Sequence, residues 1–139
     1  MRRIFVDSSF WYALAARGDV NHERSALLAR HLQTEGACLY TSVLVIAETQ
    51  RLIMHRFGVD AGRRYLRQIM IQAERGFLSV LAVSPPDLHL ALDLMQKYAE
   101  HDLSLTDACS AILMHRHRIE EAASFDLHFR LLGFTILPG

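Results

Sequence analysis

The chain has 139 residues, of which 51% are hydrophobic and 22% charged, with 3 prolines and 7 glycines. This length and composition predict that residues 1–139 form a single domain with a buried core, and they exclude a disordered protein, a collagen and a small disulfide scaffold. The 15 basic and 15 acidic residues give a formal net charge of zero, so the total charge does not indicate a nucleic-acid partner.

The first half of the chain alternates short apolar runs with helical patterns. The expected elements are strand 4–6, helix 10–16 opened by Ser8 and Ser9, helix 22–34, strand 38–41, helix 43–57 and helix 60–75. Asn21 and Ser42 are suitable N-caps for two of these helices, and Gly36 is a suitable C-terminal stop. The N-terminal strand therefore runs directly into a helix.

The second half continues the alternation. The expected elements are strand 78–83, helix 85–100, helix 104–117, strand 122–125, a short helix ending near Leu132, and strand 135–137. Strands separated by helices of this length favour right-handed βαβ units. The expected fold class is therefore α/β, a three-layer α/β/α sandwich around a mostly parallel sheet of four to five strands. In such sheets ligands bind beyond the carboxyl ends of the strands.

The cysteines and the hydropathy of the chain indicate the cellular compartment in which the protein is expected. Cys38 and Cys109 have no nearby partner at metal-ligand spacing, so both are expected to be buried free thiols. The N-terminal apolar run breaks at Asp7, and no segment approaches the ~20 apolar residues of a membrane span. We expect a soluble cytoplasmic protein without a membrane partner.

Two aspartates stand where strands are expected to end. Asp7 follows the run Ile4–Val6, and Asp126 follows the strand 122–125. Both should lie at the carboxyl edge of the sheet. The alternative for each is a helix N-cap, which stabilises a helix by about 1 kcal/mol.

Two further carboxylates are predicted inside helices. Glu48 shares a helix face with Leu44 and Leu52, so it must pair with an arginine, shift its pKa or bind a metal. Asp107 stands three residues after Ser104, which is the spacing of a capping box, and an apolar helix follows it. Asp102 is a weaker candidate in the preceding loop.

The four carboxylates Asp7, Glu48, Asp107 and Asp126 come from four separate segments. Carboxylates that converge on one place repel each other unless they share protons or surround a cation. Oxygen-only ligands select hard ions such as Mg²⁺ or Mn²⁺, and such a site suits phosphodiester hydrolysis. No competing Ser-His-acid, HExxH, P-loop or GxGxxG pattern is present.

The stretches IFVDSSFWYAL, SVLVIAETQRL, LSLTDACSAIL and ASFDLHF resemble the PIN-domain ribonucleases, in particular the VapC-like toxins of bacterial toxin–antitoxin pairs. The resemblance implies a Mg²⁺-dependent endoribonuclease, with Mg²⁺ or Mn²⁺ held chiefly by Asp7 and Asp107. Glu48 and Asp126 would close the pocket, directly or through water. It also implies an antitoxin partner.

The resemblance extends to smaller residues, since Ser9 and Ser124 fall where the family often has a small hydroxyl or amide residue near the site. The phenylalanine, tryptophan and tyrosine at 10–12 could stack on bases, but core packing is the stronger interpretation. All eight histidines are expected to be surface or structural residues, because no pair was found at ligand spacing.

The zero net charge conceals two regions of opposite sign. Residues 51–75 contain six arginines against two acidic residues, whereas residues 87–107 contain five acidic residues against one lysine. Arg63, Arg64 and Arg67 are therefore candidates for contacting RNA phosphates beside the acidic pocket. A solvated face, a dimer contact or an antitoxin contact is the alternative.

The helices of this region also carry more apolar residues than one face can bury, which predicts a homodimer or antitoxin interface. Two other functions stay open at this level. One is a non-catalytic PIN-like module that binds RNA or a protein. The other is a different acidic α/β phosphohydrolase acting on small phosphates, which the absence of a nucleophile motif after the first strand disfavours.

Overall fold

The computed structural model describes residues 1–139. Five parallel strands form one sheet in the order β3-β2-β1-β4-β5. The strands are β1 (Arg3–Val6), β2 (Cys38–Ser42), β3 (Leu78–Leu81), β4 (Glu121–Ala123) and β5 (Thr135–Leu137). The expected α/β class is confirmed, and the sheet is parallel throughout.

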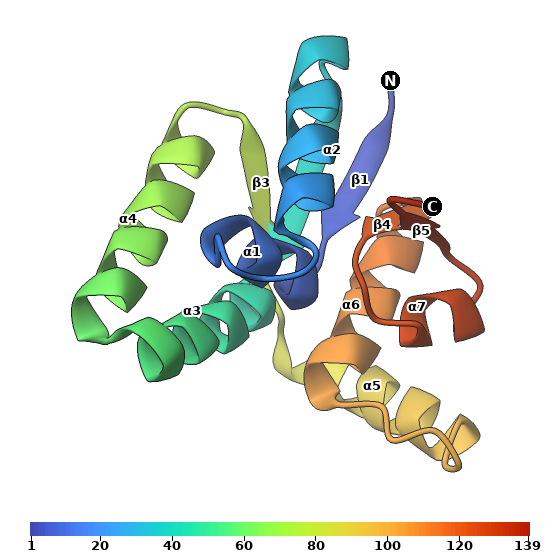
Figure 1. Ribbon diagram of the computed structural model, residues 1–139. Helices are drawn as coiled ribbons and strands as arrows, with labels where there is room; N and C mark the ends of the chain where they lie inside the picture. The colour runs from blue at the N-terminus through green and yellow to red at the C-terminus, as the bar shows by residue number, and fades with distance from the viewer.

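Seven helices connect and cover the strands (Figure 1). They are α1 (Ser8–Ala15), α2 (His22–Glu35), α3 (Val43–Phe57), α4 (Val59–Glu74), α5 (Pro85–Lys97), α6 (Leu105–Arg116) and α7 (His128–Leu131). Every expected helix and strand is present. None of the helices is long and apolar enough to cross a membrane.

Helix starts follow the capping signals of the sequence. The Ser42 hydroxyl accepts a hydrogen bond from the Val45 amide at 3.2 Å, which caps α3. Ser84 and Asp87 form a capping box at the start of α5, where Pro85 occupies the first helical position. Gly58 separates α3 from α4 at a φ of 99°, a left-handed conformation that favours glycine.

Two strands, β3 and β4, end two residues earlier than expected, for non-local reasons. β3 stops at Leu81 because it pairs only with β2, whose last residue, Ser42, is the partner of Leu81. β4 stops at Ala123 because Ser124 turns toward the end of β1, where its hydroxyl donates a hydrogen bond to Asp7. Neither limit is visible in a local pattern.

The alternation of side chains along β1 builds the core on both faces of the sheet. Ile4 and Val6 pack with Phe10 of α1 and Leu32 of α2 on one face. Phe5 points to the other face and packs into a second cluster formed mainly by α6, α7 and the last two strands. Helices therefore cover the sheet on both sides, which confirms the three-layer sandwich.

The two cysteines differ in burial. Cys109 in α6 is buried, as expected. Cys38 is only half buried, so the expectation of a buried thiol was wrong for this residue. The reason is its position, because β2 begins at Cys38, at the amino edge of the sheet, where the thiol meets the sulfur of the exposed Met1.

Candidate active site

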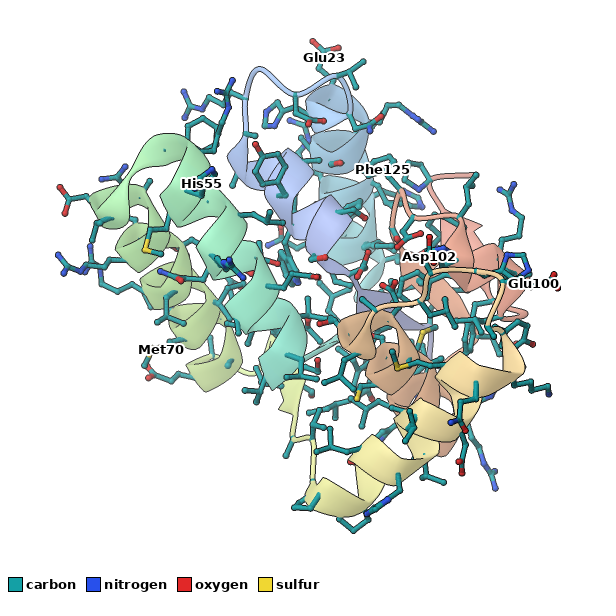
Figure 2. All side chains as sticks on the ribbon, turned by 90° about the horizontal axis from the view of Figure 1, so that it is seen from below. Glu23, His55, Met70, Glu100, Asp102 and Phe125 are labelled. Carbon is teal, nitrogen blue, oxygen red and sulfur yellow. The ribbon has the colours of Figure 1, made fainter.

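A cavity of about 440 Å³ opens at the carboxyl ends of β1 and β4, where the strand order reverses direction. Its lining residues are Asp7, Ser8, Ser9, Tyr12, Asp19, Asn21, Glu48, Leu52, Ser104, Asp107, Phe125 and Asp126. Figure 2 is viewed from the side toward which β1 runs, with Phe125 labelled at this cavity. The structure thus brings the four predicted carboxylates to one place.

Asp7, directly after β1, is 2% exposed. It occupies the N-cap position of α1, but its side chain makes no capping hydrogen bond, so capping does not account for it. Burial raises the pKa of this carboxyl group, and the charge of Asp107 raises it further, against the opposing effect of hydrogen bonds from Ser8, Ser9 and Ser124. No ion pair with an arginine, lysine or histidine compensates its charge.

Ser9 and Ser124 hold Asp7 in place. Each hydroxyl donates to Asp7 Oδ2 at 2.9 Å. The Ser9 hydroxyl also accepts from the Phe125 amide at 2.9 Å, and the Ser124 hydroxyl accepts from the Asp126 amide at 2.9 Å. Both serines lie where the resemblance placed them, and they connect α1 to the loop after β4.

Asp107 combines a capping role with a place in the cavity. Its amide donates to the Ser104 hydroxyl at 3.0 Å, and its Oδ2 accepts from the Ser104 amide at 3.3 Å, which completes the expected capping box. Burial raises the pKa of the Asp107 carboxyl group, and the neighbouring charge of Asp126 raises it further. Two carboxylates so close together are costly unless a cation lies between them.

His128 is the residue that the sequence reasoning missed. Its Nδ1 lies 3.3 Å from Asp107 Oδ2 and 3.3 Å from Asp126 Oδ1. One ligand atom from each of these three residues lies within 4.8 Å of the others. No second histidine stands at ligand spacing from His128 in the sequence. The available signal was its position two residues after a candidate aspartate, in ASFDLHF.

Glu48 reaches the cavity from the middle of α3. Its Oε2 accepts a hydrogen bond from the Ser8 hydroxyl at 2.6 Å. Its side chain makes no ion pair, so the alternative of an arginine partner was wrong. The orienting hydroxyl of Ser8 was also not predicted, because it depends on how α1 packs against α3.

The other candidates lie outside the cavity. Asp102 is exposed in the loop between α5 and α6 and does not line it. Arg63 is 3.7 Å from Asp60, and Arg64 and Arg67 line a separate cavity of about 810 Å³ beside α1 and α3. The expectation that these arginines adjoin the acidic pocket was therefore wrong. The physical reason is that α4 packs on α3, while α3 itself contributes Glu48 to the pocket (Figure 2).

The donor set fits a hard divalent cation. Four carboxylates line one cavity, and no lysine or arginine is among its lining residues. Burial raises the pKa values of Asp7 and Asp107, and a neighbouring carboxylate raises each further, Asp107 for Asp7 and Asp126 for Asp107, so the ionised forms are disfavoured in the protein alone. A divalent cation would reverse both effects and bind through carboxylate oxygens.

Comparisons with curated proteins give consistent results. The 23S rRNA-specific endonuclease VapC20 of Mycobacterium tuberculosis is 30% identical, and the alignment covers 95% of each chain. Ribonuclease VapC26 of the same organism is 25% identical, with coverage of 97% of this chain and 100% of the relative.

Solved structures resemble the fold over nearly its whole length. The crystal structure of Mycobacterium tuberculosis VapC20, described as a sarcin–ricin loop cleaving toxin, matches with a TM-score of 0.81 and 28% identity, covering 95% of this chain and 96% of that one. FitAcB from Neisseria gonorrhoeae matches with a TM-score of 0.68 and 15% identity, covering 96% and 95%, which supports the fold alone. Residues 4–134 match the family model of the PIN domain, and the chain therefore belongs to the PIN domain family.

Proposed function

We propose that this protein is a Mg²⁺- or Mn²⁺-dependent endoribonuclease that hydrolyses phosphodiester bonds of RNA and serves as the toxin of a toxin–antitoxin pair. The observation that carries the proposal is the buried Asp7, which shares a cavity with Asp107, Asp126 and Glu48 and has no cationic partner. Membership of the PIN family and the nuclease relatives support the same reaction.

Asp7 and Asp107 would hold the ion, and Asp126 and Glu48 would complete the site directly or through water. A bound divalent cation polarises the scissile phosphate and lowers the pKa of the attacking water. Ser9 and Ser124 fix the orientation of Asp7. The Ser8 hydroxyl engages Glu48 Oε2 and leaves Oε1 without a hydrogen-bond donor, so this oxygen can accept a proton from water.

The names of the relatives support a proposal for the substrate class. VapC20 is named as specific for 23S rRNA and as cleaving the sarcin–ricin loop. We propose a structured RNA loop of this kind as the substrate. The half-buried Tyr12 and Phe125 line the cavity and offer aromatic faces on which an unpaired base can stack. Arg63, Arg64 and Arg67 stay predicted contacts to more distant phosphates.

Protein partners are also part of the proposal. Similar folds occur in toxin–antitoxin assemblies, including VapBC2 from Rickettsia felis, at 9% identity and a TM-score of 0.70. The cavity of about 810 Å³ has an apolar lining that includes Trp11, Ile53 and Phe57, with Arg64 and Arg67 among its polar residues. We propose that an antitoxin segment docks here, that the protein forms a homodimer through its exposed apolar helix faces, and that it acts in the cytoplasm.

The test is cleavage of a synthetic sarcin–ricin loop RNA by the purified protein with Mg²⁺ or Mn²⁺. The Asp7→Asn variant should lose more than about a hundredfold in rate, because even residues that only orient a metal ligand contribute about 10- to 100-fold. Asp93→Asn, a change of the same kind at an exposed site on α5, should cleave like the wild type. Wild-type binding of RNA without cleavage would instead support the non-catalytic alternative.

A further inference from the structure

His128 lies between two of the proposed metal ligands without forming a strong hydrogen bond to either. Its Nδ1 is 3.3 Å from an oxygen of Asp107 and 3.3 Å from an oxygen of Asp126. Charge-assisted N–H···O bonds are shorter, at about 2.7–2.9 Å. The imidazole therefore approaches both carboxylates equally but is not tightly engaged by either one.

Backbone contacts place His128 beside these carboxylates. The His128 amide donates to Asp126 Oδ1 at 2.9 Å, which ties its backbone to the aspartate. The next residue, Phe129, is fully buried in the core and anchors the short helix α7. The His128 side chain itself stays 31% exposed. Its position thus depends on backbone contacts that a side-chain substitution would leave in place.

We infer that His128 supplies a nitrogen ligand to the divalent cation, beside the oxygens of Asp107 and Asp126, and that the site consequently prefers Mn²⁺ to Mg²⁺. The three ligand atoms lie within 4.8 Å of one another, close enough to share one ion. Mg²⁺ prefers oxygen ligands and retains water, whereas first-row transition ions accept imidazole nitrogen. The inference rests on the proposed metal-dependent function, whose carboxylates hold the same ion.

Pulsed electron paramagnetic resonance of bound Mn²⁺ tests the nitrogen ligand directly and does not depend on RNA cleavage. The wild-type protein should show nitrogen coupling to Mn²⁺, and labelling with ¹⁵N-histidine should change this coupling from ¹⁴N to ¹⁵N. The coupling should disappear in His128→Ala. It should persist in His89→Ala, which removes an exposed histidine of α5.

Calorimetric titration of each metal tests the selectivity. His128→Ala should weaken Mn²⁺ binding by at least about tenfold, while Mg²⁺ binding changes by less than about threefold. His128→Asn distinguishes two roles of His128, that of a metal ligand and that of a hydrogen-bond donor to the two carboxylates. The asparagine NH2 group can donate to both carboxylates but has no nitrogen lone pair for a metal ion. Like His128→Ala, this variant should lose the nitrogen coupling and the preference for Mn²⁺, because its amide can offer the ion only an oxygen.

Three outcomes overturn the inference. One is Mn²⁺ bound without nitrogen coupling, and another is unchanged metal preference in His128→Asn; both leave the proposed nuclease function intact. The third is a wild-type protein that binds neither Mn²⁺ nor Mg²⁺. That result would also contradict the proposed function, so the failures of the two proposals are distinguishable.

Discussion

The two ends of the sheet use carboxylates in opposite ways. At the amino edge, a cavity of about 550 Å³ is lined by charged residues of both signs, including Arg2 and Glu121. Arg2 donates two hydrogen bonds of 2.9 Å to Glu121 and one of 2.7 Å to Glu35. At the carboxyl edge, Asp7 and Glu48 receive hydrogen bonds only from neutral groups.

The pKa values of the carboxyl groups also depend on whether an arginine is nearby. The Arg2 guanidinium lowers the pKa of Glu121, and the Arg116 guanidinium lowers the pKa of the buried Asp87 to about 2. Burial raises the pKa of Asp7 and of Asp107. Glu121 and Asp87 thus have arginine partners, whereas Asp7 and Asp107 have no arginine or lysine partner, which leaves a deficit of positive charge around them. Such a deficit is typical of a binding site.

Matched neutral substitutions at the two ends should have opposite consequences. Asp107→Asn should reduce RNA cleavage by more than about a hundredfold while leaving the metal-free protein at least as stable. Glu121→Gln should leave cleavage unchanged and destabilise the fold by about 1 kcal/mol, the upper range for a partly exposed ion pair. Cleavage rates and thermal unfolding of both variants check this. Equal effects on activity would show that the two ends are not functionally distinct.

The pH dependence of stability should depend on whether a cation is present. A carboxyl group with a raised pKa in the folded state keeps its proton after the unfolded chain has lost it. As the pH rises from about 4 through the raised pKa values of Asp7 and Asp107, the metal-free protein should therefore lose stability. Glu121 and Asp87 have lowered pKa values in the folded protein, so their ionised forms stabilise the fold. This stabilisation is lost as the pH falls from about 4 toward 2.

A cation at about 100 times its dissociation constant should add about 2.7 kcal/mol to the free energy of unfolding near neutral pH. It should also remove the loss of stability that the metal-free protein shows above pH 4. Thermal unfolding between pH 4 and 7, with and without Mn²⁺, measures both effects. Asp7→Asn is the control, because it should flatten the metal-free profile. If Mn²⁺ does not change the unfolding temperature, the carboxyl edge of the sheet does not have the proposed deficit of positive charge.

An arginine introduced at the carboxyl edge should make it resemble the amino edge. Leu52 lines the acidic cavity and is 46% exposed, so Leu52→Arg can place a guanidinium near Glu48 without disturbing the core. We expect cleavage to fall by about tenfold, roughly 1.4 kcal/mol, with recovery at higher metal concentration. Leu52→Gln controls for the change of size and polarity. A loss that metal cannot restore would indicate a steric effect instead.

The sequence predicted every helix and strand because the signals are local. Apolar periodicity and caps such as Ser42 and Ser104 depend on residues a few positions apart. The ends of β3 and β4 were not predictable in this way, since they depend on the length of a neighbouring strand and on the contact of Ser124 with Asp7.

The same distinction applies to the site. Asp7 and Asp126 follow strand patterns, and Glu48 follows from helix phase, so their convergence could be predicted. The Ser8 contact with Glu48, the position of His128 between two carboxylates and the separation of the α4 arginines from the cavity depend on how helices pack. These tertiary relations explain why Arg63, Arg64 and Arg67 were wrongly expected beside the acidic cavity.

The smallest predicted effect concerns the serine hydroxyl groups that donate hydrogen bonds to Asp7 at the carboxyl edge, where no arginine does so. Ser9 donates to Asp7 Oδ2 at 2.9 Å and lowers the pKa of this carboxyl group against the effect of burial. Ser9→Ala removes the hydrogen bond to Asp7, which contributes about 1 kcal/mol, and also the bond that the Ser9 hydroxyl accepts from the Phe125 amide, while Ser124 still holds the carboxylate. Cleavage should therefore fall only about fivefold, and more at acidic than at neutral pH, because Asp7 would keep its proton to higher pH. Ser79→Ala, in the edge strand β3 and outside the cavity lining, should have no effect on the pH profile. A pH-independent loss in Ser9→Ala would mean that Ser9 only fixes the geometry of Asp7 and does not stabilise its charge.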